Sequence, residues 1–209
     1  MAMVTEGGAL EVSDLLEAND GDLLAIRDFV FFQHVEASSY SDASRAAQVS
    51  ELLTDFPDLA EVGSAIDAGA PLRRGAWLYR AAATGEIVAA VGLKISSTSP
   101  EALDISYLFT HPRYRKRGLA RRLLRRALVA AAAQDGVEAV RLLTLAGVYD
   151  AAVALYTSEK FRVYQRVEPS AGICPHYTLL YMQLDDLAPW RSAGSPAVAA
   201  MRACTAMRV

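Results

Sequence analysis

Segments with the apolar pattern of a β-strand alternate along the chain with segments in which apolar residues recur every three or four positions, as in a helix. Two apolar runs, 77–83 and 87–96, flank the turn Thr84-Gly85-Glu86, and this arrangement predicts a β-hairpin. Over 118–134, apolar residues recur every three or four positions, which predicts a long helix that Asp135-Gly136 ends. The pattern predicts further strands over 9–12, 103–110, 137–145, 161–167 and 177–184.

The two ends of the chain carry weaker patterns. Apolar residues from Leu23 to Val30 recur at roughly helical spacing after Asn19-Asp20-Gly21-Asp22, which predicts a first helix there. Shorter helices are predicted over 42–53 and 150–160, and a mixed loop over 57–75. Beyond residue 186 the composition shifts to Ala, Ser, Pro, Gly and Arg, which predicts a C-terminal tail over 187–209. The order of elements therefore predicts one mixed α/β domain over 1–186.

Composition favours a single folded domain. The 209 residues are 53% hydrophobic and 22% charged, which argues against disorder and allows a full core without disulfides. The two cysteines, Cys174 and Cys204, cannot build a disulfide framework, and no zinc-ligand spacing is present, so we expect no metal. The first residues lack the features of a secretory signal, and no apolar run approaches the roughly 18 residues of a membrane span. The sequence therefore predicts a cytoplasmic protein with reduced thiols and no membrane contact.

A basic cluster is the most unusual local feature. Eight basic residues and no acidic residue lie between 113 and 126, in a chain whose net charge is −3. Arg121, Arg122, Arg125 and Arg126 lie opposite the apolar stripe of the predicted helix, so the simplest interpretation of these four is a solvated face. The rival interpretation is a nucleic-acid-binding module. That module needs a basic face extending beyond one helix, and because the rest of the chain supplies none, nucleic-acid binding is disfavoured.

The segment just before this helix has its own chemistry. Arg115-Lys116-Arg117-Gly118-Leu119-Ala120 follows a strand and opens the helix. The first four N–H groups of a helix have no internal partner, and the helix dipole favours an anion there. Gly118 permits a tight turn, and the small Ala120 lets a ligand approach. The segment therefore predicts a pyrophosphate site, although the glycine motifs of dinucleotide-binding and P-loop proteins are absent.

These residues resemble the GNAT superfamily of acyl-CoA-dependent N-acyltransferases. The family's central motif, [RQ]-x-x-G-x-[GA], matches 115–120, and Pro112 precedes it as a proline does in the family. A second family motif, A-x-x-L-Y, matches 152–156, five residues before Phe161. Each motif is short, but together they occur at the expected separation on the expected elements. The resemblance spans about 9–184 and implies the GNAT fold, an α/β architecture whose mostly antiparallel twisted sheet splays between two central parallel strands.

The resemblance also implies roles for individual residues. The backbone of Leu108, Phe109 and Thr110 would pair with the pantetheine arm of acetyl-CoA. The loop amides would hold its pyrophosphate, and they belong to Arg115, Lys116, Arg117, Gly118, Leu119, Ala120 and Arg121. Tyr156 would protonate the departing thiolate, and its free pKa of about 10 lies close enough to the thiol's pKa of about 8.5 for general acid catalysis. The alternative for Tyr156 is a core aromatic residue on an amphipathic helix.

The sequence departs from the family pattern at three positions. Tyr149 stands where many members have an asparagine, and Thr144 stands where bacterial ribosomal-protein acetyltransferases place a glutamate base. Lys160 replaces the glycine that precedes the final phenylalanine, so the helix is expected to end without its left-handed glycine cap.

Asp104 is the candidate general base. The histone-acetyltransferase branch of the family places its glutamate base eleven residues before the pyrophosphate loop, and counting back from Arg115 gives Asp104. Period-two alternation predicts that Asp104, Ser106 and Leu108 share one face of their strand. The alternative is a solvent-exposed strand residue with no role in the reaction.

The expected function is transfer of the acetyl group of acetyl-CoA to a primary amine by direct attack. The amine could be a protein N-terminus, a lysine or a small molecule. Two alternatives stay open: an acyl-CoA-binding protein of the same fold without turnover, which Thr144 and Tyr149 favour, and the nucleic-acid-binding module. The sequence names neither the acceptor nor the oligomeric state, and a homodimer is left open.

Overall fold

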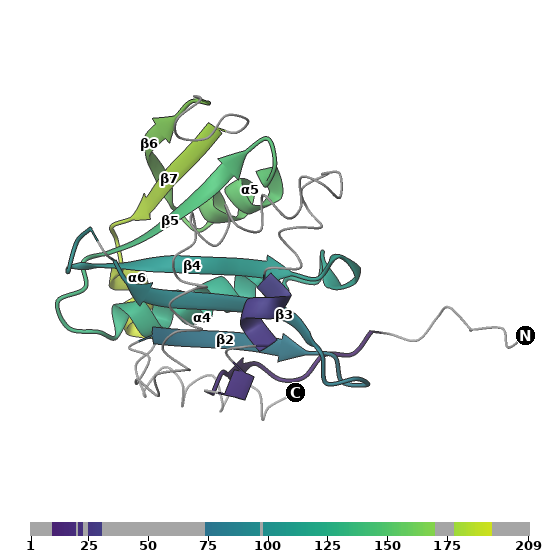
Figure 1. The fold of residues 1–209 in the computed structure, drawn as a ribbon. Helices are drawn as coiled ribbons and strands as arrows, with labels where there is room; N and C mark the ends of the chain where they lie inside the picture. The colour runs from purple at the N-terminus through teal and green to yellow at the C-terminus, as the bar shows by residue number, and fades with distance from the viewer. Residues whose placement is uncertain are drawn as a thin grey trace, which may run out of the picture.

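The computed structural model describes residues 10–19, 21–22, 25–30, 74–96, 98–169 and 178–193. In this part of the chain seven strands form one sheet, in the order β1-β2-β3-β4-β5-β7-β6. The strands are β1 Leu16–Glu17, β2 Arg74–Arg80, β3 Ile87–Ile95, β4 Ala102–Thr110, β5 Ala139–Ala146, β6 Arg162–Val167 and β7 Thr178–Leu184. The predicted α/β architecture is confirmed (Figure 1).

The sheet is antiparallel except at its centre. There, β4 and β5 run parallel, and their pairing extends only from Ala102 to Ile105 on β4 and from Ala139 to Leu142 on β5. Beyond these residues β4 continues beside β3, and β5 continues beside β7. The two central strands therefore separate, and Figure 1 shows β5 turning away from β4. This is the splayed sheet that the sequence predicts.

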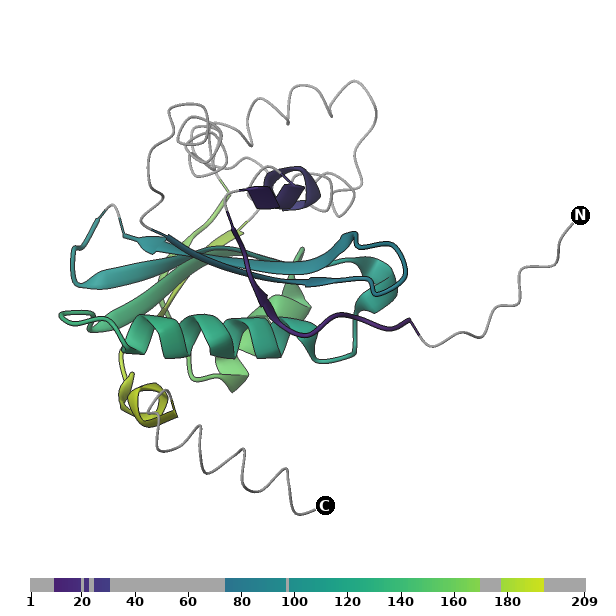
Figure 2. The same cartoon turned by 90° about the horizontal axis from the view of Figure 1, so that it is seen from below.

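Elements cover both faces of the sheet. The long helix α4, Leu119–Ala132, packs on one face through its apolar stripe (Figure 2). The buried residues of α4 are Leu119, Leu123, Leu124, Ala127, Leu128, Ala131 and Ala132. On the opposite face, Ile26 and Val30 of a helical stretch pack against Ala76, Leu78 and Ala90. The predicted first helix and the predicted long helix are therefore both present, and they lie on opposite sides of the sheet.

A β-bulge in β4 reverses the alternation of its side chains. Gly92 of β3 pairs with Tyr107, and the next residue of β3 pairs with Ile105, so Ser106 is the extra residue. Ile105 and Leu108 consequently both pack in the core beneath α4, whereas Tyr107 packs on the opposite face. The prediction that Asp104, Ser106 and Leu108 share one face is wrong, because simple alternation does not survive a bulge. Gly92 fits this geometry, since a Cβ there would lie 2.4 Å from the Tyr107 ring.

The ends of the described chain depart from the sequence-based expectations. The first strand was expected at 9–12, but β1 is Leu16–Glu17, and Val12 forms an isolated bridge with Ala81. The expected helix at 42–53 and nearly all of the expected loop at 57–75 lie outside the described residues. The domain boundary at 186 stays a prediction. Just beyond it, Leu187 is buried and α6, Ala188–Ala193, follows.

Helix α5, Asp150–Ser158, ends in a left-handed turn despite lacking a glycine. Lys160 has φ 73°, its N–H donates to the Thr157 carbonyl, and the Phe161 N–H donates to the Tyr156 carbonyl. This pair of hydrogen bonds is the Schellman motif, completed by contact between the Tyr156 and Phe161 rings. The expectation that the left-handed cap is lost is therefore wrong: Lys160 adopts the conformation that usually selects glycine.

Replacing Lys160 with glycine should stabilise the protein. A non-glycine residue in the left-handed region raises the free energy of the folded state by about 1–2 kcal/mol. Glycine removes this strain but loses more conformational entropy on folding, which offsets roughly 0.5–1 kcal/mol of the stabilisation. We therefore expect Lys160→Gly to raise the free energy of unfolding by roughly 0.5–1 kcal/mol. Urea unfolding measures the change. The control is Ala154→Gly, an exposed site inside α5 where glycine should cost about 1 kcal/mol. Destabilisation by Lys160→Gly would contradict the strained cap.

Candidate active site

The candidate site lies where β4 and β5 separate. Leu108, Phe109 and Thr110 are half-buried and form the end of β4, beyond the last residue that pairs with β5. The Thr110 hydroxyl is buried and has no hydrogen-bond partner within the described residues. Tyr149, at the start of α5, packs edge-on against Phe109 with ring centroids 6.2 Å apart. The residue that replaces the family's asparagine therefore contacts the strand predicted to hold the coenzyme arm.

A short turn connects this strand to α4. The 3-10 helix η1, Pro112–Tyr114, begins after His111, whose Nδ1 accepts a hydrogen bond from the Arg113 N–H at 3.3 Å. Lys116 follows with φ 60° and Gly118 with φ 76°. Left-handed residues set between others turn nearby N–H groups into a concave cluster, which is a known way to bind anions. The two left-handed residues thus make this turn a candidate anion site beside the helix N-terminus.

The backbone donors of this turn have few internal partners. The Arg115 N–H donates to the Pro112 carbonyl at 3.2 Å, and the first α-helical bond runs from the Arg122 N–H to the Gly118 carbonyl at 3.1 Å. Between them, no N–H of 116–121 donates to a backbone carbonyl of the described residues. The dipole of a 14-residue helix adds partial positive charge at the same place. Of the seven residues predicted to bind the pyrophosphate, Arg115 already donates its N–H within the turn, and coenzyme binding by the set stays a prediction.

Several side chains of the basic cluster hold the turn in shape. Arg115 Nε donates to the Thr110 carbonyl at 3.1 Å, which ties the turn to the end of β4. Arg117 donates to the Leu10 carbonyl at 2.5 Å and lies over the Tyr114 ring. The Lys116 side chain is exposed. These cations surround the backbone donors with positive charge, while the two arginines also make contacts inside the protein.

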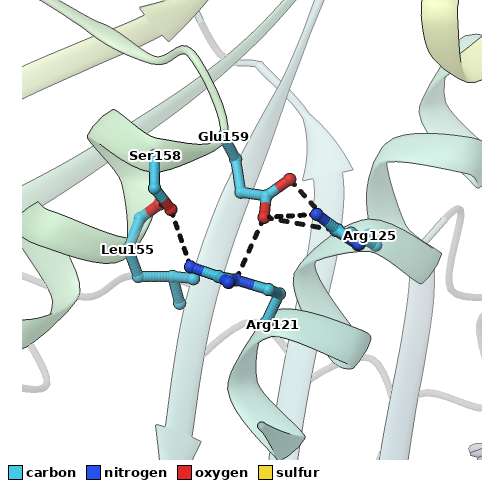
Figure 3. Close-up of polar contacts among 5 residues, drawn as sticks. All are labelled: Arg121, Arg125, Leu155, Ser158 and Glu159. Carbon is cyan, nitrogen blue, oxygen red and sulfur yellow. Dashed lines mark hydrogen bonds and ion pairs between the residues drawn. The ribbon is translucent and has the colours of Figure 1, made fainter.

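A buried carboxylate connects α4 to the end of α5 (Figure 3). Glu159, only 5% exposed, lies 3.1 Å from Arg121 Nε and accepts hydrogen bonds from Arg125 at 3.0–3.2 Å. Arg121 also donates to the Ser158 hydroxyl at 2.9 Å. The interpretation of Arg121 and Arg125 as merely solvated is therefore wrong. Glu159 was missed because nothing but its position, three residues after Tyr156, sets it apart in the sequence.

Tyr156 is buried on the same side of the sheet as α4. It is 6% exposed, packs in the core beneath α4, and its ring centroid lies 5.8 Å from that of Phe161. The phenol is protonated at neutral pH, as a general acid must be, but burial raises the pKa of Tyr156 further above that of a thiol, which makes the buried phenol a weaker acid than a free tyrosine. Its orientation toward a bound thioester stays a prediction.

Asp104 lies on the opposite face. Its neighbours Leu103 and Ile105 pack beneath α4, so alternation turns Asp104 away from that helix. It is half-buried, and in register it lies between Lys94 of β3 and Arg141 of β5. It is also the next-to-last residue of β4 in the ladder with β5, directly before the strands separate. Asp104 and Tyr156 therefore lie on opposite faces of the sheet, with Asp104 directly before the point where the central strands separate.

Comparisons with known proteins agree with this geometry. The acetyltransferase (GNAT) family matches residues 42–161, which is more than half of the chain. The chain belongs to the GNAT acetyltransferase family. No curated protein gives a match to the sequence. The family match includes β2 to β5, the basic turn, α4 and α5, so both sequence motifs lie inside it.

Solved structures of GNAT proteins share the fold. A GNAT-family acetyltransferase from Streptococcus pneumoniae is 17% identical, with a TM-score of 0.57, and the match covers 83% of this chain and 98% of that one. The PaiA N-acetyltransferase from Thermoplasma acidophilum, in complex with coenzyme A, is 15% identical, with a TM-score of 0.56 and coverage of 84% and 99%. NAA60 from Arabidopsis thaliana, in complex with a bisubstrate analogue, is 15% identical, with a TM-score of 0.56 and coverage of 81% and 97%.

The two cysteines of the chain, Cys174 and Cys204, lie outside the described residues. Within the described part of the chain, no three His, Cys, Asp or Glu side chains gather as metal ligands would. In the same part, no helix is both long and apolar enough to span a membrane. Within the described residues, the polar groups near the opening include the backbone N–H groups of 116–121 and the Asp104 carboxylate.

Proposed function

We propose that this GNAT protein transfers the acetyl group of acetyl-CoA to a primary amine. The observation that carries the proposal is the cluster of N–H groups from 116 to 121, which have no carbonyl partner within the described residues. The cluster lies at the end of the strand that separates from β5. Backbone donors at a helix N-terminus suit a pyrophosphate, and a strand edge suits an extended amide arm. Coenzyme A carries both groups.

The residues of the opening fit such a molecule. The end of β4 lies directly before the turn, so an arm running along 108–110 would bring the pyrophosphate to 116–121. The Thr110 hydroxyl, buried and unsatisfied within the described residues, offers one further hydrogen-bonding group along that route. The surrounding cations, Lys116 among them, favour the negative charge of the phosphates.

The reaction needs one bond to form, one to break and two protons to move. The nitrogen of a neutral amine attacks the thioester carbon, the C–N bond forms, and the C–S bond breaks to release a thiolate. The Tyr156 phenol donates a proton to that thiolate and is afterwards reprotonated from solvent. Asp104 accepts the proton that the amine loses, directly or through water. Tyr156 and Asp104 lie on opposite faces of the sheet. We therefore infer that the coenzyme sulfur is reached from the face of Tyr156 and that the amine approaches from the face of Asp104.

A second function has support from two positions. Thr144, buried at 5% exposure, cannot act as a base at neutral pH, and Tyr149 packs on the strand that would hold the coenzyme arm. These residues favour an acyl-CoA-binding protein without turnover. Calorimetric titration with acetyl-CoA, followed by thiol release on a panel of peptide N-termini, lysine and polyamines, separates the two. Amine-dependent thiol release supports the acetyltransferase, binding alone supports the second function, and no binding contradicts both.

Replacing Gly118 with valine should abolish most of the stabilisation by acetyl-CoA. A ligand that binds the folded state raises the melting temperature, and a β-branched residue cannot easily keep φ 76°. The control is Gly136→Val, because Gly136 has φ 77°, and at both glycines an added Cβ would have open space. Both variants should lose about 1–2 kcal/mol of stability from the strained backbone. Only Gly118→Val should lose the ligand-induced shift, and a normal shift in that variant would place the coenzyme elsewhere.

Replacing Tyr156 with phenylalanine should slow turnover at least roughly tenfold while the KM for acetyl-CoA changes little. The ring and its packing on Phe161 remain, but the proton donor is lost, and general acid catalysis is typically worth ~100- to 10,000-fold. The lower limit allows for a thiolate that leaves fairly well without a proton. Steady-state kinetics on any accepted amine provides the measurement. If the variant keeps more than about half of the activity, Tyr156 is a packing residue.

Replacing Asp104 with asparagine should change the pH dependence of the rate. A carboxylate base loses its function as falling pH protonates it, so the wild-type rate should decline on the acidic side. Asparagine cannot take up a proton, so the variant should be slow and should lack the part of the decline that the carboxylate causes, while protonation of the amine slows both proteins alike. Coenzyme binding, measured by calorimetry, should stay unchanged. A wild-type pH profile in the variant would exclude Asp104 as the base.

A further inference from the structure

The contact between α4 and the last turn of α5 depends on one buried carboxylate. Glu159 is 5% exposed on its side chain, whereas Arg121 and Arg125 are 50% and 55% exposed. Arg125 approaches both carboxylate oxygens, with Nε at 3.1 and 3.2 Å and a terminal nitrogen at 3.0 Å. Such charge-assisted, two-point contacts fix orientation as well as distance. We call Glu159, Arg121 and Arg125 the α4–α5 clamp.

The other contacts that hold α5 to the core are apolar. Within Asp150–Ser158, Tyr156 is buried, Ala152, Val153 and Leu155 pack partly buried against the core, and Phe161 packs on Tyr156 just after the helix ends. Apolar contacts are not directional, so they fix the orientation of a helix less sharply than a hydrogen-bonded ion pair does. The clamp supplies the polar contact that defines the orientation of this turn. Figure 3 shows the two arginines of α4 meeting Glu159 beside Ser158.

Arg121 links the clamp to the candidate coenzyme site. It lies in the first turn of α4, and its own N–H is one of the donors without a carbonyl partner in the described chain. Its side chain reaches Glu159 at 3.1 Å and the Ser158 hydroxyl at 2.9 Å, and Ser158 in turn donates to the Leu155 carbonyl at 2.7 Å. One residue thus belongs to the anion-binding turn through its backbone and to the turn after Tyr156 through its side chain.

We propose that Glu159 is a positioning residue that holds the last turn of α5, and with it Tyr156, in a fixed orientation to the coenzyme end of α4. The inference rests on the proposed acetyltransferase function. Occupation of the N–H groups at 116–121 orders Arg121, and through Glu159 it orders the turn that carries Tyr156. Without the carboxylate, the backbone donors and the charge of Arg121 remain, so the coenzyme still binds. What is lost is the placement of the phenol.

The first test is hydrogen–deuterium exchange with and without coenzyme A. In the wild type, coenzyme A should slow exchange over both 116–121 and 156–161. In Glu159→Gln it should slow exchange over 116–121 but no longer over 156–161. The matched control is Glu168→Gln, which breaks an exposed ion pair with Arg166 at the far end of β6 and should behave as the wild type. Equal protection of both segments in Glu159→Gln would overturn the proposal.

Kinetics gives the second test, with Arg125→Gln as the companion variant. Arg125 is exposed and lies one turn beyond the donor cluster, so its replacement removes the two-point contact on Glu159 without altering 116–121. Both variants should lower kcat about tenfold, with little change in the Kd for coenzyme A. This loss is smaller than the ~100-fold that a 1 Å misplacement of a catalytic group can cost. In a Tyr156→Phe background, Glu159→Gln should have no further effect on kcat. An additive loss would mean that Glu159 acts only through stability.

These outcomes distinguish the clamp from the proposed function. If the wild type binds coenzyme A but acetylates no amine, the acetyltransferase proposal fails, and the exchange experiment still decides whether the clamp couples the two helices. If the wild type binds no coenzyme A, both proposals fail together. If the wild type is active and Glu159→Gln matches it in kcat and exchange, the clamp alone is refuted.

Discussion

The short parallel ladder between β4 and β5 is the constraint on which the rest of the structure depends. It joins only four residues of each strand, whereas β5 pairs with β7 along seven residues from Val140 to Ala146. Each central strand is thus held more firmly by its outer neighbour than by the other central strand. Because strands twist, two such halves diverge once their shared ladder ends. The bulge at Ser106, one residue past the end of the ladder, bends β4 further and increases the divergence.

The separation explains why backbone groups, rather than arginine side chains, form the proposed anion site. Once β4 leaves β5, its end runs directly into the turn that opens α4, and the left-handed Lys116 and Gly118 shape that turn. The guanidinium groups of Arg115 and Arg117 bind carbonyls of the protein itself, and that of Arg121 binds Glu159. The basic cluster therefore builds the turn and its positive field. The amides, which are rigid and already oriented, remain available for a ligand.

Structural features that follow from a repeating pattern of residues could be predicted from the sequence, whereas features that depend on a single contact could not. The period of α4, the hairpin of β2 and β3 and the turn before Gly118 follow from apolar spacing and glycine placement, the splay follows from the family resemblance, and all appear in the structure. The bulge at Ser106 could not be found this way, since one extra residue leaves no mark on a short strand. Nor could the pairing of Glu159 with Arg121, because it joins residues from two helices. The left-handed cap at Lys160 was not predicted, because this conformation is normally assigned to glycine. Here the surrounding hydrogen bonds impose it on a lysine.

Two consecutive residues directly after α5, Glu159 and Lys160, are unfavourable for stability, and both lie in the turn that follows Tyr156. Glu159 places a charge at a site with 5% exposure, where a well-packed apolar residue would serve stability as well or better. Lys160 adopts a strained backbone angle. An apolar contact permits small sliding movements, but a carboxylate held by two guanidinium groups permits few, and the left-handed turn directs Phe161 back onto Tyr156. Both features restrict the same turn, and this turn carries Tyr156, the proposed proton donor.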